Sequence, residues 1–163
     1  MILLDTNILS TFCKIRRLSL IFEVLKKEVL YISPNVFKEL KKARDKGYSF
    51  SNNAFESIKN NRLQVINLTP EEKTETIKIP SSFAAGERDS IVVCKKRSWI
   101  FITNEKKVIN YCKKQGIMYF DLIDILKAMH EFMGYSKEDI RSLIEEIEKK
   151  DNILIKNKEE IFG

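Results

Sequence analysis

Four short apolar runs and one alternating run, each followed by a stretch with helical spacing, constrain the fold of this 163-residue chain more than any other feature. A short apolar run fits a strand buried on both faces, and apolar residues three and four apart indicate an amphipathic helix. Their alternation predicts a parallel sheet with helices on both of its faces. The predicted strands are residues 2–4, 29–32, 63–68, 99–103 and 117–120.

The size and composition of the chain fit one globular domain. Hydrophobic residues make up 44% and charged residues 32%, which argues against a disordered chain. We expect residues 1–163 to form a single domain in which residues 136–163 are a C-terminal helix and tail. The run Ile153-Leu154-Ile155 in this tail predicts an edge strand or a contact between subunits.

The cysteines and the N-terminal region indicate the compartment. Cys13, Cys94 and Cys112 are odd in number and far apart, which argues against disulfides and a zinc site and favours a reducing cytosol. We interpret the single histidine, His130, as structural. Acidic Asp5 interrupts the apolar N-terminus, and no stretch approaches the roughly 18 apolar residues of a membrane span. We therefore expect a soluble, cytoplasmic protein without a membrane partner.

The formal net charge of +6 favours a polyanionic partner such as nucleic acid. Lysine and arginine neutralise phosphates and release counterions, which is the main source of affinity for nucleic acids. Surfaces rich in lysine and glutamate also serve solubility alone, so the charge leaves both readings open.

Asp5 follows the first predicted strand directly, and Thr6 and Asn7 extend the polar stretch. In open α/β sheets, ligands bind outside the carboxyl ends of the strands, which makes Asp5 a candidate site residue. Asp, Thr and Asn are also good helix caps, so a purely structural role for this stretch is equally open.

Glu39 is the next candidate, in a helix that Ser33 and Pro34 begin after the second strand. It shares a face with Val36 and Leu40, so we expect it to point toward the interior. A buried carboxylate is costly unless a cation or an arginine pairs with it.

Glu87 and Asp89 lie two positions apart in the helix expected before the fourth strand. On a regular helix they point roughly 200° apart, so both cannot face one point. Asp89 shares its face with Ala85, Val92 and Val93, which predicts that Asp89 is the inner acid and Glu87 lies nearer the rim.

Glu105 follows the fourth strand together with Thr103 and Asn104, and completes a set of acids at one edge of the sheet. Clustered carboxylates repel one another unless cations neutralise them, and hard oxygen ligands suit Mg²⁺ or Mn²⁺ better than zinc. One or two such ions can bind a scissile phosphate and activate water. The acids would then hold metal while the lysines hold a nucleic-acid backbone.

Four motifs in this order resemble the PIN-domain nucleases over nearly the whole chain. They are Leu4-Asp5-Thr6-Asn7, Ile32-Ser33-Pro34-Asn35-Val36-Phe37-Lys38-Glu39-Leu40, Gly86-Glu87-Arg88-Asp89-Ser90-Ile91 and Ile102-Thr103-Asn104-Glu105. The resemblance implies a three-layer α/β/α sandwich with a central parallel five-stranded sheet, commonly a homodimer, that cuts RNA with Mg²⁺ or Mn²⁺. It places Asp5, Glu39 and Asp89 on catalytic or metal-binding positions, with Thr6 and Asn7 in support.

Glu105 departs from the family pattern, which has Asp at this catalytic and metal-binding position. The extra methylene changes the metal geometry, and Asn104 is the alternative ligand. Many small PIN proteins are toxins paired with an antitoxin protein, which the resemblance makes a hypothesis for this chain. The alternatives are an inactive PIN-fold RNA-binding scaffold, and a phosphatase with a nucleophilic Asp5, which would need an acid where Asn7 stands.

Overall fold

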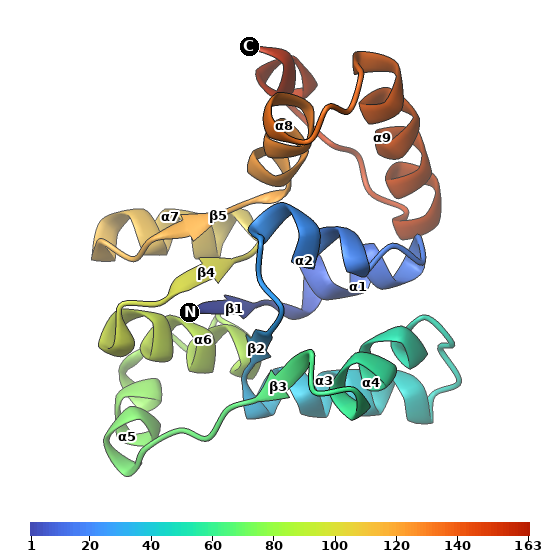
Figure 1. The fold of residues 1–163 in the computed structure, drawn as a ribbon. Helices are drawn as coiled ribbons and strands as arrows, with labels where there is room; N and C mark the ends of the chain where they lie inside the picture. The colour runs from blue at the N-terminus through green and yellow to red at the C-terminus, as the bar shows by residue number, and fades with distance from the viewer.

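A five-stranded sheet with all strands parallel and in the order β3-β2-β1-β4-β5 forms the centre of the protein (Figure 1). The computed structural model describes residues 1–163. The strands are β1 (Ile2–Leu4), β2 (Leu30–Ile32), β3 (Leu63–Val65), β4 (Ile100–Ile102) and β5 (Tyr119–Phe120). This confirms the predicted α/β fold. The order reverses between β1 and β4, and ligands in open α/β sheets bind at such a reversal.

Nine α-helices and one 3₁₀-helix surround the sheet. They are α1 (Thr6–Lys14), α2 (Ser19–Leu25), α3 (Pro34–Asp45), α4 (Ser51–Lys59), α5 (Pro70–Lys78), α6 (Ala85–Arg97), α7 (Lys106–Gln115), α8 (Leu122–Phe132), α9 (Lys137–Asp151) and η1 (Lys158–Phe162). A turn after Lys14 separates α1 from α2, and Arg16 adopts a φ of 56° in it.

Both faces of the sheet are covered, because successive residues of a strand point to opposite sides. Ile2 and Leu4 belong to the larger core cluster, which includes apolar residues of α1, α2, α8 and α9. Leu3 points the other way, into a smaller cluster with residues of α6 and α7. Burial on both faces explains why β1 is apolar throughout.

The strands after β1 are shorter than predicted. β3 ends at Val65 because its partner β2 ends at Ile32, where Ser33 begins α3 by accepting a hydrogen bond from the Val36 amide at 3.2 Å. The expected edge strand in the tail is absent. Ile155 instead packs into the larger core cluster, and its amide donates to Glu148 Oε1 at 2.8 Å.

The cysteines and the histidine occupy structural positions. All three cysteines are buried and unpaired, as predicted, and burial raises the pKa of the Cys13 and Cys112 thiols to about 12. His130 Nδ1 lies 2.8 Å from the Tyr135 carbonyl oxygen, and the imidazole packs edge-on against Phe162. The three thiols are thus packed in the protein interior, and the nearby charge of Asp5 contributes to the raised pKa of Cys112.

Candidate active site

Asp5 lies at the carboxyl end of β1, between the ends of β2 and β4, and only 3% of it is exposed. Oδ1 accepts a hydrogen bond from the Thr6 amide at 2.8 Å, and Oδ2 accepts one from Thr103 Oγ1 at 2.8 Å. Asp5 therefore caps α1 and also stands where an α/β sheet binds ligands, so both sequence readings apply.

The surroundings of Asp5 favour its neutral form. The pKa of the Asp5 carboxyl is raised from 3.8 to about 7, mainly by burial and to a smaller extent by the negative charges of Glu87 and Glu39, while the hydrogen bonds from Thr103 and Thr6 oppose the rise. The charges that act on Asp5 thus come from other acids, and no arginine or lysine forms an ion pair with it.

Glu39 reaches the same place from α3. The Thr6 hydroxyl donates a hydrogen bond to Glu39 Oε2, which ties α3 to the first residue of α1. Gly86, in the first turn of α6, lies against this carboxylate: a Cβ there would stand 3.0 Å from Glu39 Oε1 and 3.0 Å from Val36 Cγ2. A side chain at position 86 would therefore displace α3 or its acid.

Glu87 is the third acid of this group. Its Oε2 accepts a hydrogen bond from the Ala84 amide at 2.8 Å, so it caps the N-terminus of α6. The one cation close to it is Lys107, whose Nζ is 3.7 Å from Oε2 and donates to the Ser82 carbonyl oxygen at 2.8 Å. We name Asp5, Glu39 and Glu87 the acid edge.

Asp89 turns away from the acid edge. Its Oδ2 accepts hydrogen bonds from the Asn35 amide nitrogen at 3.2 Å and from Asn35 Nδ2 at 2.9 Å. Burial raises the pKa of Asp89, while these bonds, one from Ser33 and the charge of Lys38 oppose the rise. Asp89 does not act on Asp5 as Glu87 does.

Asp89 is buried and Glu87 is half-buried, in keeping with the prediction that Asp89 is the inner acid and Glu87 lies nearer the rim. Spacing did not predict that Glu87 is the acid whose charge acts on Asp5. The middle of α6 has no single inward face, since Ile91, Val92, Val93 and Cys94 are all buried, so the two acids point into the protein in different directions.

The segment after β4 supports Asp5 through Thr103. This residue is fully buried, and its hydroxyl also accepts a hydrogen bond from the Glu105 amide at 3.2 Å. Asn7 Oδ1 accepts bonds from the Ile8 amide at 2.7 Å and the Asn104 amide at 3.4 Å. The Glu105 side chain makes no capping bond at the start of α7 and is half-buried.

The donors of the acid edge are carboxylate and hydroxyl oxygens, which suit a hard divalent cation. Each Asp5 oxygen accepts one hydrogen bond and retains a lone pair, and the mutual repulsion of the acids would be relieved by a cation. No three His, Cys, Asp or Glu side chains are already arranged as a metal-binding group. The residues thus fit a metal in chemistry and require small side-chain movements to enclose one.

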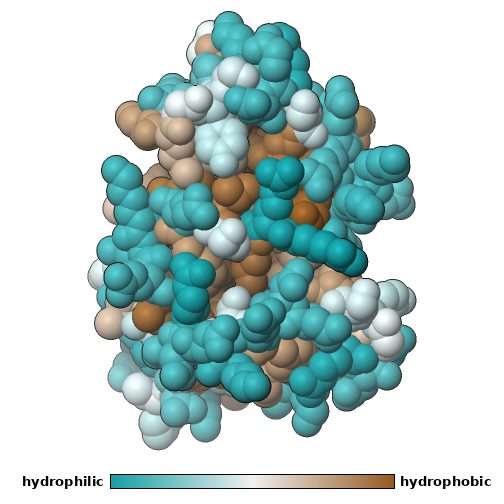
Figure 2. Space-filling view, turned by 45° about the vertical axis from the view of Figure 1, so that its right-hand side comes forward, coloured by the Kyte–Doolittle hydropathy of each residue, from teal (hydrophilic) through white to brown (hydrophobic).

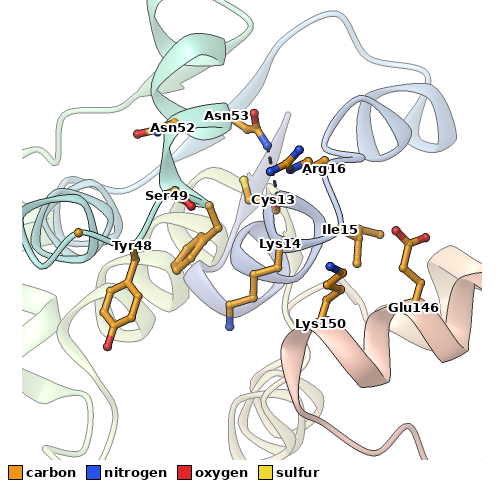
Figure 3. A pocket seen from close by; sticks show the side chains of 12 residues that line it. Cys13, Lys14, Ile15, Arg16, Tyr48, Ser49, Asn52, Asn53, Glu146 and Lys150 are labelled. Atoms are coloured by element: carbon orange, nitrogen blue, oxygen red, sulfur yellow. Dashed lines mark hydrogen bonds between the residues drawn. The ribbon is translucent and has the colours of Figure 1, made fainter.

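The largest hollow of the protein lies at the other end of α1 (Figure 3). Its volume is about 800 Å³, and α1, the segment between α3 and α4, and α9 contribute its walls. Figure 3 shows Lys14, Lys150 and Tyr48 reaching it from these three elements. Arg16 and Lys150 have no carboxylate within 4.0 Å, whereas Lys14 pairs with Asp151 at 2.5 Å. We name this the basic hollow.

The side of the molecule in Figure 2 is mostly hydrophilic, with hydrophobic residues visible in its middle. The basic hollow was not predicted from the sequence, where positive charge was assigned only to the chain as a whole. Lys107 and Gly86 were also missed, since their importance depends on contacts between separate elements. Sequence spacing gives no signal for such contacts.

The comparison with known families agrees with this geometry. A family model described as a PIN domain matches residues 1–159, so the chain belongs to the PIN-domain family. Proteins of this family are generally nucleases and typically use divalent metals. No curated protein matches the chain. None of the helices has the length and apolar character needed to cross a membrane.

Proposed function

We propose that this PIN domain is a divalent-metal-dependent endoribonuclease whose reaction centre is the acid edge. The observation that carries the proposal is that three acids from α1, α3 and α6 meet at the reversal of the strand order, and none of them is paired with an arginine. Asp5 is buried without a cationic partner, which is unfavourable for folding and favours a functional role.

Mg²⁺ or Mn²⁺, when bound there, would supply Lewis-acid activation of water and of the scissile phosphate. Asp5 would be the principal ligand, because the Thr6 amide and the Thr103 hydroxyl fix both of its oxygens. Glu39 and Glu87 would complete the donor set, with Glu87 in the role that spacing suggested for Asp89. Glu105 or Asn104 would stand at the outer edge.

The basic hollow would hold the RNA backbone on one side of the acid edge. α1 begins at the acids and ends at the hollow after nine residues, which is about 13 Å at 1.5 Å per residue. Arg16 and Lys150 would neutralise phosphates, and the exposed Tyr48 would offer a surface on which a base stacks.

The test is RNA cleavage with Mn²⁺, with Mg²⁺ and with chelator, by the wild type and by Asp5→Asn, Glu87→Gln and Glu131→Gln. Glu131 is an exposed acid of α8 remote from the acid edge, so its variant controls for the loss of one negative charge. We expect cleavage to require metal and to be lost in the first two variants only. Equal activity in all four proteins would refute the proposal.

A second candidate is an RNA-binding PIN scaffold without turnover. Glu105 in place of the usual Asp, and the lack of a ready three-acid metal group, favour it. Tight RNA binding without cleavage under any metal would select this alternative.

A toxin role with a cognate antitoxin and a homodimeric state are further proposals from the family resemblance. Expression of the wild type in a bacterial host should arrest growth, and Asp5→Asn should not. A gene for a small DNA-binding protein directly beside this one would support the pairing, and a solitary gene would oppose it.

A further inference from the structure

A separate pocket of about 440 Å³ lies beside the acid edge, between the carboxyl ends of β2 and β3. Its volume is within the ~300–1,000 Å³ typical of small-ligand sites. Asn35 and Lys38 of α3, Asn67 after β3, Lys73 of α5 and Asp89 of α6 line it. The pocket lies next to the acid edge along the chain, because its lining residue Lys38 precedes Glu39 and its lining residue Asp89 follows Glu87 by two residues.

The interior of this pocket presents fixed hydrogen-bond acceptors. Asp89 is 95% buried by surface area, since only 5% of it is exposed, and its Oδ2 is held by two bonds from Asn35. Both bonds from Asn35 go to Oδ2, so Oδ1 of Asp89 retains acceptor capacity for a ligand. Asn35 donates through Nδ2, so its amide oxygen is a further acceptor in the lining of the pocket.

The rim of the pocket is cationic. Lys38 and Lys73 are both exposed, and neither has a carboxylate within 4.0 Å. A ligand with donor groups at one end and a phosphate at the other would therefore match both the interior and the rim.

We propose that this pocket binds the guanine base of the RNA nucleotide next to the cleaved bond, with Asp89 as the residue that selects guanine. Guanine presents two adjacent donors, N1–H and the N2 amino group, on its Watson–Crick edge. Adenine, cytosine and uracil each place an acceptor beside their donor there, which the carboxylate repels. Proteins commonly read unpaired RNA bases on this edge. The choice of RNA as ligand rests on the proposed nuclease function.

The test is the binding of GMP, AMP, CMP and UMP to the whole protein without divalent metal, by calorimetry or by NMR titration. A bidentate contact to a base is worth about 1–3 kcal/mol, which converts to a preference for GMP of roughly 5- to 150-fold. Asp89→Asn should abolish this preference, because its amide nitrogen opposes the N1–H donor. Lys73→Gln should weaken the binding of all four nucleotides to a similar extent.

Inosine monophosphate, which lacks the N2 amino group, tests the same contact on the unaltered protein if Asp89→Asn fails to fold. It should bind several-fold more weakly than GMP. Equal binding of the four nucleotides by the wild type, or a preference that survives Asp89→Asn, overturns the proposal.

The two proposals fail separately. If the protein prefers GMP but cuts no RNA, the proposed nuclease function is refuted and the proposed guanine pocket stands. If the protein cuts RNA without a preference for guanine and binds the four nucleotides equally, only the proposed guanine pocket is refuted.

Discussion

Two buried acids in this protein, Glu72 and Asp5, have neighbours of opposite charge. Glu72 of α5 is 4% exposed and pairs with Arg97 of α6, whose Nε and Nη2 donate to its two oxygens at 2.7 Å each. Arg97 holds the pKa of Glu72 below its usual value. At the acid edge Asp5 is equally buried and has acids as neighbours, and its pKa is raised to about 7. Burial alone thus does not determine what an acid does; its partner does.

The neighbouring charge distinguishes an acid that stabilises the fold from an acid proposed to act in the site. The Glu72 pair joins α5 to α6, and Arg97 Nη2 also donates to the Asn67 carbonyl oxygen at 2.8 Å. The acid edge joins α1, α3 and α6 around charges that only Lys107, 3.7 Å from Glu87, offsets, and no basic residue pairs with Asp5. Removal of a charge should therefore weaken the fold at Glu72 and strengthen it at Asp5. Five measurements test this contrast, in order of expected effect.

Arg97→Ala should lower the free energy of unfolding by about 3 kcal/mol, because it leaves the buried Glu72 carboxylate without its cationic partner. Chemical denaturation with urea measures this change. Lys78→Ala is the control, since Lys78 pairs with Glu75 on the exposed surface at 2.8 Å and should cost less than about 1 kcal/mol. Equal losses in the two variants would contradict the contrast.

Asp5→Asn should reduce RNA cleavage by roughly 100-fold or more, since it removes the principal proposed metal ligand. The same variant should unfold at a higher temperature than the metal-free wild type at pH 8, because it no longer buries a charge. Thermal unfolding measured with chelator checks the second part. Loss of both activity and stability would mean that Asp5 serves the fold alone.

Thr103→Val should reduce cleavage about tenfold at pH 7, because the Thr103 hydroxyl orients Asp5 and lowers its pKa. Valine keeps the shape and removes the hydrogen bond. The pH–rate profile is the decisive measurement: its midpoint should move to higher pH. A lower rate with an unmoved midpoint would assign Thr103 a purely structural role.

The stability of the metal-free protein should depend on pH through Asp5. Its pKa is higher in the folded state than the usual 3.8, so the folded state binds the proton more tightly than the unfolded chain does. The resulting stability is complete below about pH 4 and is lost as the pH rises through 7, by up to about 4 kcal/mol. Urea titrations between pH 4 and 8 should show this decline, and Asp5→Asn should lack it.

Arg16→Ser and Lys150→Ser should each weaken RNA binding a few-fold and reduce the slope of log affinity against log salt by about 0.7. Fluorescence anisotropy with a single-stranded RNA, titrated between roughly 50 and 300 mM salt, measures this slope. An unchanged slope would show that the backbone does not cross the basic hollow.

The sequence predicted the sheet and its connections because four of the strands are uninterrupted apolar runs followed by a polar residue, and β3 alternates between apolar and polar residues. Ile2–Leu4 followed by Asp5 is the clearest case, and the structure buries this strand on both faces. The choice between Glu87 and Asp89 was not accessible in the same way. A helical wheel assigns an inner face only to a helix with one buried side, and α6 is buried all round.

The tail shows a second limit. Ile153, Leu154 and Ile155 have the composition of a strand, but no neighbouring strand edge receives them, and only Ile155 enters the core. β propensity describes a residue's fit to an existing sheet, so a short apolar run is not enough to add a strand. The pairing of Glu72 with Arg97, 25 residues apart, was likewise invisible to patterns of local spacing.

The absence of a side chain at Gly86 sets how far apart Glu39 and Glu87 can be. Gly86 of α6 lies directly against α3, so any larger residue at this position would push the two helices apart and enlarge the gap between the two carboxylates. Gly86→Ala would thus change metal affinity without altering any ligand. The selectivity between small Mg²⁺ and larger cations would follow from the packing of α3 on α6.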